Sequence, residues 1–176
     1  GVYIRDGVIE AVGHTGNLPN SADDIIDARD HVVLPGFVNT HHHLFQTLTR
    51  AVPAAQDAPL FGWLQTLYPI WSRIGPGHIH VSALTGMAEM MLSGCTTSSD
   101  HLYLFPNGAR LDDEIAAAHK IGLRFTATRG SMSIGKSNGG LPPDILTERE
   151  DHILADCERV IGAFHDRRRH AMVHVA

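Results

Sequence analysis

The chain has 176 residues, of which 43% are hydrophobic and 19% are charged, and its formal net charge at pH 7 is -5. This composition is typical of a folded globular protein and excludes a disordered chain. The negative charge argues against a nucleic-acid-binding surface, and the sequence has no apolar stretch of 18 or more residues that would predict a membrane-spanning helix. Cys95 and Cys157 form no CxxC pattern and predict free thiols. We therefore expect a cytoplasmic protein whose partner is neither nucleic acid nor membrane.

The first 34 residues predict short strands. Two strand-like runs flank Asp6-Gly7, a pair that strongly favours a hairpin turn. Asp24–Asp27 and Val32–Leu34 predict two more short strands. We expect residues 1–34 to form part of a small β-sandwich, with an edge extension of the following sheet as the alternative.

From Phe37 onward, the pattern alternates between strands and helices. The predicted strands are Phe37–His43, Cys95–His101, Leu123–Arg129 and Ala171–Ala176. The predicted helices are Leu60–Arg73, Gly77–Ser93, Asp112–Ile121 and Thr147–Asp166. The last helix has a capping-box pattern at Thr147 and Glu150. Gly130–Leu146 is rich in Gly, Ser and Pro, which favours a substrate loop or lid.

This alternation predicts an α/β fold with a parallel sheet and right-handed crossovers. A complete (β/α)8 barrel of the TIM type needs about 250 residues. We therefore expect residues 35–176 to be the N-terminal half of such a barrel, and the chain to be truncated.

The most informative motif is the histidine triplet His41, His42 and His43 at the end of the first barrel strand. Strand side chains alternate between faces, so His41 and His43 are expected to point one way and His42 the other. Imidazoles at positions i and i+2 can bind one metal ion, with Zn the first expectation and Fe the second. The alternative for each histidine is an ordinary surface or core position. A catalytic zinc ion usually has three protein ligands, so this pair is incomplete.

Other polar residues stand near the ends of the predicted strands. The amide of Gln46 suits a heterocycle's ring nitrogen and carbonyl group, although an ordinary loop residue is the alternative. His101 is the candidate substrate contact on the second strand, while Asp100 points to the opposite face and is expected to be structural. Arg129 ends the third strand and either binds a substrate oxygen or pairs with a carboxylate.

The string PGFVNTHHHLFQTLTR resembles the signature of the amidohydrolase superfamily, in which PGxVNxHxH ends the first barrel strand. HHHLFQTLTRA and TTSSDHLYLFPNG are similar to a narrower group, the aminohydrolases of oxidised purines and hydroxylated triazines. The resemblance covers essentially the whole chain. It implies that His41 and His43 bind one divalent metal ion and that Gln46 contacts the substrate. It also favours Trp63 as an aromatic substrate contact, with core packing as the alternative for Trp63 and Trp71.

The reaction implied by the resemblance is hydrolysis of a C–N bond other than a peptide bond, by deamination of an oxidised purine such as 8-oxoguanine or a related aminated heterocycle. One alternative is a triazine alkylaminohydrolase or chlorohydrolase. An alternative of another class is an inactive fragment that lacks the remaining metal ligands. The resemblance places those ligands and the acid/base group beyond Ala176. The partner is expected to be a small heterocyclic substrate, and homo-oligomerisation of the intact protein stays open.

Overall fold

The computed structural model describes all 176 residues. The chain divides into two compact units, Gly1–Pro35 and Gly36–Ala176. None of its helices combines the length and hydrophobicity that crossing a membrane requires.

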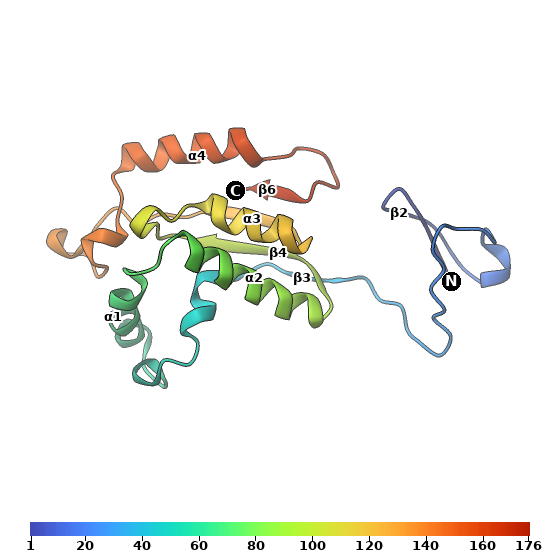
Figure 1. Ribbon diagram of the computed structural model, residues 1–176, viewed down its shortest axis with the longest axis horizontal. Helices are drawn as coiled ribbons and strands as arrows, with labels where there is room; N and C mark the ends of the chain where they lie inside the picture. The colour runs from blue at the N-terminus through green and yellow to red at the C-terminus, as the bar shows by residue number, and fades with distance from the viewer. The chain divides into compact units, whose positions relative to one another are not determined.

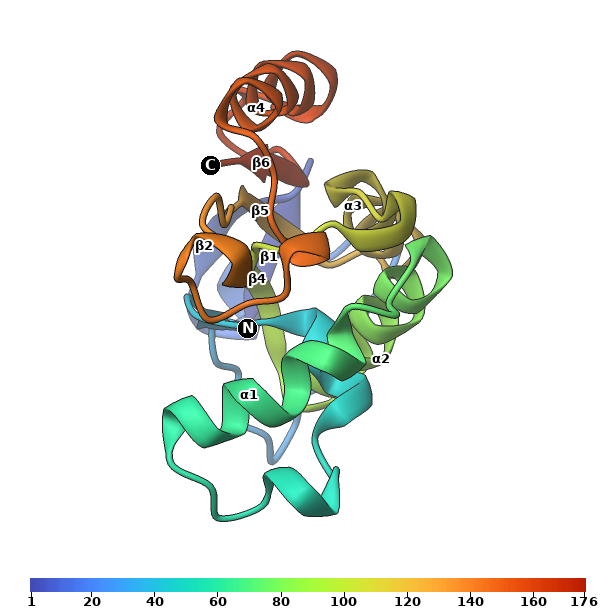
Figure 2. The same ribbon diagram turned by 90° about the vertical axis from the view of Figure 1, so that its left-hand side faces the viewer.

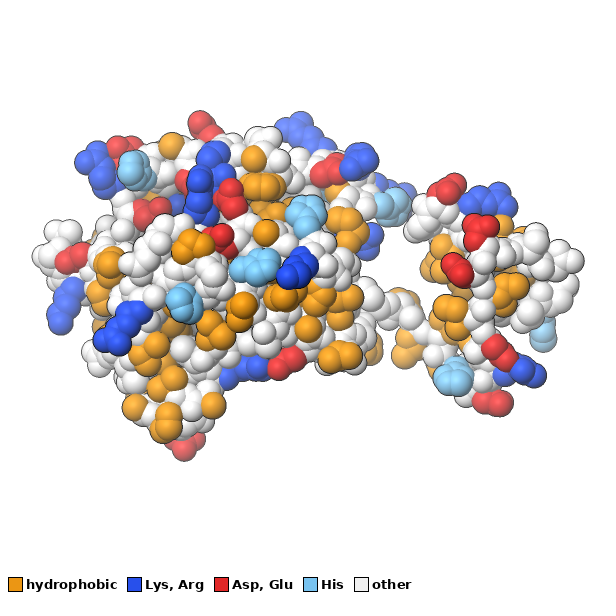
Figure 3. All heavy atoms as spheres, in the orientation of Figure 1, with side chains coloured by type: hydrophobic (Ala, Val, Ile, Leu, Met, Phe, Trp, Pro, Cys, Tyr) orange, Lys and Arg blue, Asp and Glu red, His pale blue; other side chains and the backbone are white.

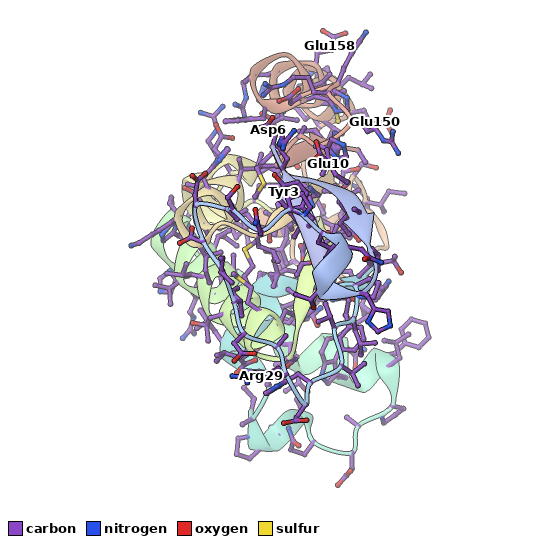
Figure 4. The ribbon with its side chains drawn as sticks, turned by 90° about the vertical axis from the view of Figure 1, so that its right-hand side faces the viewer. Tyr3, Asp6, Glu10, Arg29, Glu150 and Glu158 are labelled. Carbon is purple, nitrogen blue, oxygen red and sulfur yellow. The ribbon has the colours of Figure 1, made fainter.

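The first unit contains one antiparallel hairpin of strands β1 (Val2–Arg5) and β2 (Val8–Val12). Asp6 lies at the tip of this hairpin (Figure 4). Asp6 and Gly7 have φ angles of 49° and 75°, and two successive positive φ angles are characteristic of the turn that joins such strands. The predicted hairpin is therefore confirmed.

The two further strands expected in this unit are absent, so those predictions were wrong. Asp24–Asp27 and Val32–Leu34 belong to no strand, and Ile25 and Ile26 are 77% and 89% exposed. A strand is stabilised by the hydrogen bonds of a neighbouring strand, and these segments pair with none. Local β propensity is insufficient without that partner.

The second unit contains a four-stranded parallel sheet in which the strand order follows the sequence (Figures 1 and 2). The strands are β3 (Phe37–Asn39), β4 (Cys95–Leu102), β5 (Arg124–Arg129) and β6 (Val173–Val175). Each strand is parallel to its neighbours. The predicted α/β class with a parallel sheet is thus confirmed. A doubly wound sheet would instead reverse its strand order at a switch point.

Four helices accompany the sheet, and α2, α3 and α4 lie along one of its faces (Figure 2). They are α1 (Leu60–Trp71), α2 (Pro76–Leu92), α3 (Leu111–Ile121) and α4 (Glu150–Phe164). Short 3₁₀ turns occupy Thr15–Asn17 (η1), Leu44–Thr49 (η2), Pro53–Ala55 (η3), Pro106–Gly108 (η4), Lys136–Asn138 (η5) and Asp144–Leu146 (η6). Helix α2 contacts β4, α3 contacts β5 and α4 contacts β6. The core of this unit therefore lies between the helices and one face of the sheet.

Burial alternates along β4 and assigns its side chains to two faces. Ser98, Asp100 and Leu102 are buried, whereas Ser99 and His101 between them are more exposed. Since successive strand residues point to opposite faces, Asp100 lies on the helix-covered face and His101 on the other. The structure agrees with the predicted separation of these two side chains.

The first strand of the parallel sheet is shorter than the sequence predicts, because β3 ends at Asn39 and not at His43. The hydrogen bonding to β4 nevertheless continues past this end, since the His101 amide donates to the His42 carbonyl at 3.1 Å. The histidine triplet is thus an irregular extension of β3 that stays attached to β4.

Helix α4 begins at Glu150, and the predicted capping box at its start is wrong. The Thr147 hydroxyl donates to the Asp144 carbonyl at 2.8 Å instead of capping the helix, and no side chain caps the N-terminus of α4. The turn η6 thus competes for this hydroxyl group, as Thr side chains near turns often do.

The loop between β5 and α4 is closed by its own hydrogen bonds. The Lys136 amide donates to the Pro142 carbonyl at 2.8 Å, and the Ser137 hydroxyl donates to the Asp144 carboxylate at 2.9 Å. These internal hydrogen bonds hold the loop in a compact conformation. Its role as a substrate loop or lid stays a prediction.

Apolar side chains remain exposed over α1 and the loop before it (Figure 3). Leu60 and Phe61 are 64% and 70% exposed. On the edge strand β3, Phe37 and Val38 are 60% and 64% exposed. The second unit therefore has two exposed apolar areas, one at the start of α1 and one on the edge strand β3.

Candidate metal and substrate site

The His43 ring is oriented by a backbone carbonyl. Its Nδ1 lies 2.8 Å from the carbonyl oxygen of His101. Because a carbonyl oxygen only accepts, Nδ1 carries the hydrogen and Nε2 keeps a free lone pair. The His41 ring is exposed, and its centroid lies 5.1 Å from that of His43. The two imidazoles therefore lie side by side, with at least one nitrogen ready to bind a cation.

This arrangement fits two ligand positions of a metal site. Histidines that bind metal ions usually donate their second ring N–H to a carbonyl or carboxylate, as His43 does. No group of three His, Cys, Asp or Glu side chains in the chain could hold a metal ion. The chain therefore offers an oriented pair of candidate ligands.

His42 points away from this pair, as the strand alternation predicts. Its Nδ1 lies 3.8 Å from Asp100 Oδ1 and has no hydrogen-bond partner. Burial, together with the neighbouring His43, lowers the pKa of His42, so the ring is neutral at pH 7. His42 thus borders the helix-covered side of β4.

His101 and Tyr103 line the same side as His43. The His101 and Tyr103 rings lie 5.7 Å and 5.3 Å from the His43 ring, between centroids. Burial lowers the pKa of His101, and the charges of His43 and His41 lower it further. Burial raises the pKa of Tyr103 to about 12. Both groups are therefore uncharged at neutral pH and can form hydrogen bonds with a neutral heterocycle.

The two tryptophans have different environments. Trp71 is fully buried, and its Nε1 donates to Thr49 Oγ1 at 3.1 Å. Trp63 is partly buried and packs edge-on against Trp71 at 5.2 Å between centroids. Only Trp63 keeps an accessible ring surface for a planar ligand.

Gln46 lies in the first turn of η2, directly after the histidines. Its backbone amide donates to the His43 carbonyl at 3.0 Å, and the residue is partly buried. The backbone of Gln46 is thus tied to His43, and its side chain neighbours the Tyr103 hydroxyl.

Arg129 forms the carboxylate pairing that was one of its two predicted roles. Its side chain is 2% exposed. The guanidinium group donates to the Glu148 carboxylate at 2.7 Å and to the Asp156 carboxylate at 3.1 Å. The guanidinium group also donates to the Gly130 carbonyl and stacks 4.1 Å from the centre of the Phe105 ring. The structure therefore binds Arg129 to α4 and to the segment before it, and does not bring it to the histidine pair.

Sequence reasoning missed one buried acid near the site. Glu114 is fully buried, and Asp100 is the neighbouring charged group that raises its pKa. A signal for this burial exists, because Glu114 shares a face of α3 with Leu111, Ile115 and Ala118. A carboxylate on the apolar face of an amphipathic helix indicates an enclosed, partnered group.

Residues 32–175 match the model of the amidohydrolase family, and the chain belongs to this family. Over its whole length, it is 44% identical to 8-oxoguanine deaminase of Pseudomonas aeruginosa and covers 40% of that protein. It is 33% identical to hydroxydechloroatrazine ethylaminohydrolase of Pseudomonas sp. strain ADP, with 99% of this chain and 39% of that protein aligned. The chain thus spans about two fifths of the length of these curated relatives.

The fold resembles that of a solved relative. The crystal structure of atrazine chlorohydrolase from Arthrobacter aurescens TC1, complexed with zinc, matches 81% of this chain and 34% of that protein. The TM-score is 0.72 and the sequence identity is 31%.

Proposed function

We propose that this chain carries part of a metal-dependent aminohydrolase that deaminates an oxidised purine such as 8-oxoguanine, or a related aminated heterocycle. The observation that carries the proposal is the oriented pair of imidazoles at His41 and His43. The 44% identity to an 8-oxoguanine deaminase supports the reaction and substrate class.

The proposed architecture is the first half of a (β/α)8 barrel over residues 35–176, preceded by part of a small β-sandwich over residues 1–34. The sequential order of the parallel strands, with helices along one face, supports the half-barrel. The exposed apolar side chains of Phe37 and Val38 on the edge strand β3 support a sheet that further strands extend.

His41 and His43 would hold one divalent metal ion, zinc by preference and iron as the alternative. When bound, such an ion lowers the pKa of a bound water from about 15.7 toward about 7 and supplies a nucleophile at neutral pH. The contribution of the chain is orientation, since the His101 carbonyl prevents the His43 ring from rotating.

Three further residues would hold the substrate. The Gln46 amide offers both a donor and an acceptor to the edge of a heterocycle. The accessible ring of Trp63 suits stacking on a planar ligand. His101 contributes a neutral imidazole beside the pair. Together these groups would keep the ring carbon that bears the amine close to the site of attack.

A second candidate function is displacement of an alkylamine or chloride from a triazine. The structural match to atrazine chlorohydrolase favours this candidate. It would use the same histidines and a different leaving group. A third reading, of another class, is a chain that is inactive because it has only two ligands.

The test uses the protein expressed from its whole reading frame and loaded with zinc. It is incubated with 8-oxoguanine, guanine, an ethylamino-hydroxytriazine and a chlorotriazine, and ammonia, ethylamine and chloride are quantified. Ammonia from 8-oxoguanine or guanine is expected, with none from the His43→Ala variant. Ethylamine or chloride alone would favour the second candidate. The absence of every product from zinc-loaded protein would contradict both and support the inactive reading.

A further inference from the structure

Two carboxyl groups meet in the interior between β4 and α3. Asp100 is 1% exposed and Glu114 is fully buried, and their carboxyl groups are close enough for each to change the pKa of the other. Asp100 Oδ2 and both carboxyl oxygens of Glu114 are buried and have no hydrogen-bond donor in the rest of the protein. Ionised carboxylates only accept hydrogen bonds, so the contact requires that one group keeps a proton and donates it to the other.

The surroundings favour this protonated form. Burial raises the pKa of Asp100 to about 7. Burial also raises the pKa of Glu114 well above its usual range, and the nearby charge of Asp100 raises it further. An ionised pair at this depth would be costly, because two like charges would share a site with low polarity.

Asp100 also binds the main chain next to the metal-ligand pair. Its Oδ1 accepts a hydrogen bond from the amide of Leu44, the residue that follows His43. From the other side, the Ser82 hydroxyl in α2 donates to the Leu44 carbonyl at 2.5 Å. The peptide groups on both sides of Leu44 are thus held by buried side chains from β4 and α2.

Close packing of α2 reinforces this hold. A Cβ atom at Gly86 would lie 2.7 Å from Leu44 Cδ2 and 3.0 Å from Thr47 Oγ1. A larger residue at position 86 would therefore push η2 away from α2. The glycine allows the approach that the Ser82 hydrogen bond needs.

Two consecutive residues of β4, Asp100 and His101, therefore form hydrogen bonds with two consecutive residues after β3, Leu44 and His43. The His101 carbonyl accepts from the His43 ring, and the Asp100 carboxylate accepts from the Leu44 amide. Glu114 is the buried acid that neighbours Asp100 behind these contacts.

We propose that Asp100 and Glu114 are positioning residues of the metal site, which share one proton and thereby fix the main chain at Leu44 and the orientation of His43. This inference rests on the proposed function, since it assigns His43 as a metal ligand. Neither carboxyl group contacts the substrate. They act through the backbone of η2.

The test compares Glu114→Gln with Glu114→Met in the protein expressed from its whole reading frame. Both side chains are close to glutamate in size, but only the glutamine amide can donate a permanent hydrogen bond to Asp100. Two quantities are measured, hydrogen–deuterium exchange at the Leu44 amide and zinc affinity by competition with a chelator. Ile115→Ala, a buried change on the same helix, controls for general destabilisation.

Glu114→Met is expected to speed exchange at Leu44 about tenfold relative to β5 amides, because Asp100 loses its partner. It is also expected to weaken zinc binding by about 10-fold to 100-fold, as is usual for outer-shell changes. Glu114→Gln should stay within about threefold of the wild type in both quantities, since it retains a donor. Ile115→Ala should lower the stability without changing either quantity in the folded state.

A Glu114→Met protein with wild-type exchange at Leu44 would overturn the proposal, as would a Glu114→Gln protein that behaves like Glu114→Met. If Glu114→Met does not fold, Glu114→Asp takes its place, because its shortened side chain withdraws the carboxyl group from Asp100. Unchanged exchange at Leu44 in that variant would equally contradict the proposal. Failure of the wild-type protein to bind zinc would instead contradict the proposed function, while the exchange data would still decide whether the pair holds Leu44.

Discussion

The backbone of His101 holds the histidine loop at two points. Its carbonyl oxygen accepts from Nδ1 of His43 at 2.8 Å, and its amide donates to the carbonyl of His42 at 3.1 Å. A side-chain and a backbone contact from one residue fix both the path of the loop and the face that His43 presents. The exposed ring of His41 lies beside that face.

His41→Ala is expected to weaken zinc binding by at least about 100-fold, because the pair loses one of its two imidazoles. The stability of the metal-free protein should hardly change, since His41 is exposed and its ring forms no hydrogen bond that the fold needs. Chelator competition and urea unfolding measure the two effects. His31→Ala is the control, because His31 is also exposed but lies outside the proposed site. Equal zinc affinity in the two variants would remove His41 from the proposed ligands.

Substitutions of the two tryptophans are expected to have different effects, Trp71→Ala mainly on the free energy of unfolding and Trp63→Ala mainly on substrate binding. Trp71→Ala is expected to cost about 3–5 kcal/mol of unfolding free energy, since it empties a fully buried site. Trp63→Ala should cost about 1–2 kcal/mol, because Trp63 is only partly buried. Its main effect should be a severalfold higher KM for the heterocycle. Urea unfolding and steady-state kinetics test this division, and an unchanged KM for Trp63→Ala would argue against a stacking role.

Arg129→Met is expected to lower the free energy of unfolding by about 2–4 kcal/mol. This loss is smaller than for a fully buried ion pair, because Glu148 and Asp156 stay partly hydrated. The turnover of the folded protein should be unaffected, since Arg129 is committed to these carboxylates. Arg149→Met is the matched control, because its pair with Asp151 is exposed and its loss should not be measurable. A large loss of kcat at full stability in Arg129→Met would restore the substrate-binding role.

The Asp100–Glu114 pair predicts a pH dependence of stability. The pKa of Asp100 rises from its usual 3.8 to about 7 in the folded protein, so the folded state binds more protons than the unfolded state between these values. The contribution of the pair is therefore fully present below about pH 4 and is lost as the pH rises toward 7. In Glu114→Gln the permanent amide donor favours ionised Asp100, which should reduce this loss.

The measurement is urea unfolding of metal-free wild type and Glu114→Gln from pH 4.5 to pH 8. The stability of Glu114→Gln relative to the wild type should increase with pH, by up to about 1.4 kcal/mol per unit for one proton. A difference that is constant over the whole range would show that the pair exchanges no proton on unfolding.

Much of the fold could be predicted because its signals are local. The helices α1, α2 and α3 begin and end within one or two residues of their predicted bounds, since apolar spacing and glycines mark their ends. The strands expected at Asp24–Asp27 and Val32–Leu34 failed because a strand needs a partner, and the apolar residues there are exposed. The capping box at Thr147 failed because the turn η6 claims the same hydroxyl group.

The sequence by itself determined the spacing of His41 and His43, their place after the first parallel strand and the family resemblance, because these depend only on residue order and strand alternation. Only the tertiary structure decided which polar groups meet across elements. It paired Arg129 with Glu148 and Asp156, and it enclosed Asp100 with Glu114 behind Leu44. The physical reason is that burial and hydrogen-bond partners arise from segments distant in sequence, so a residue's type constrains its possible partners without selecting one.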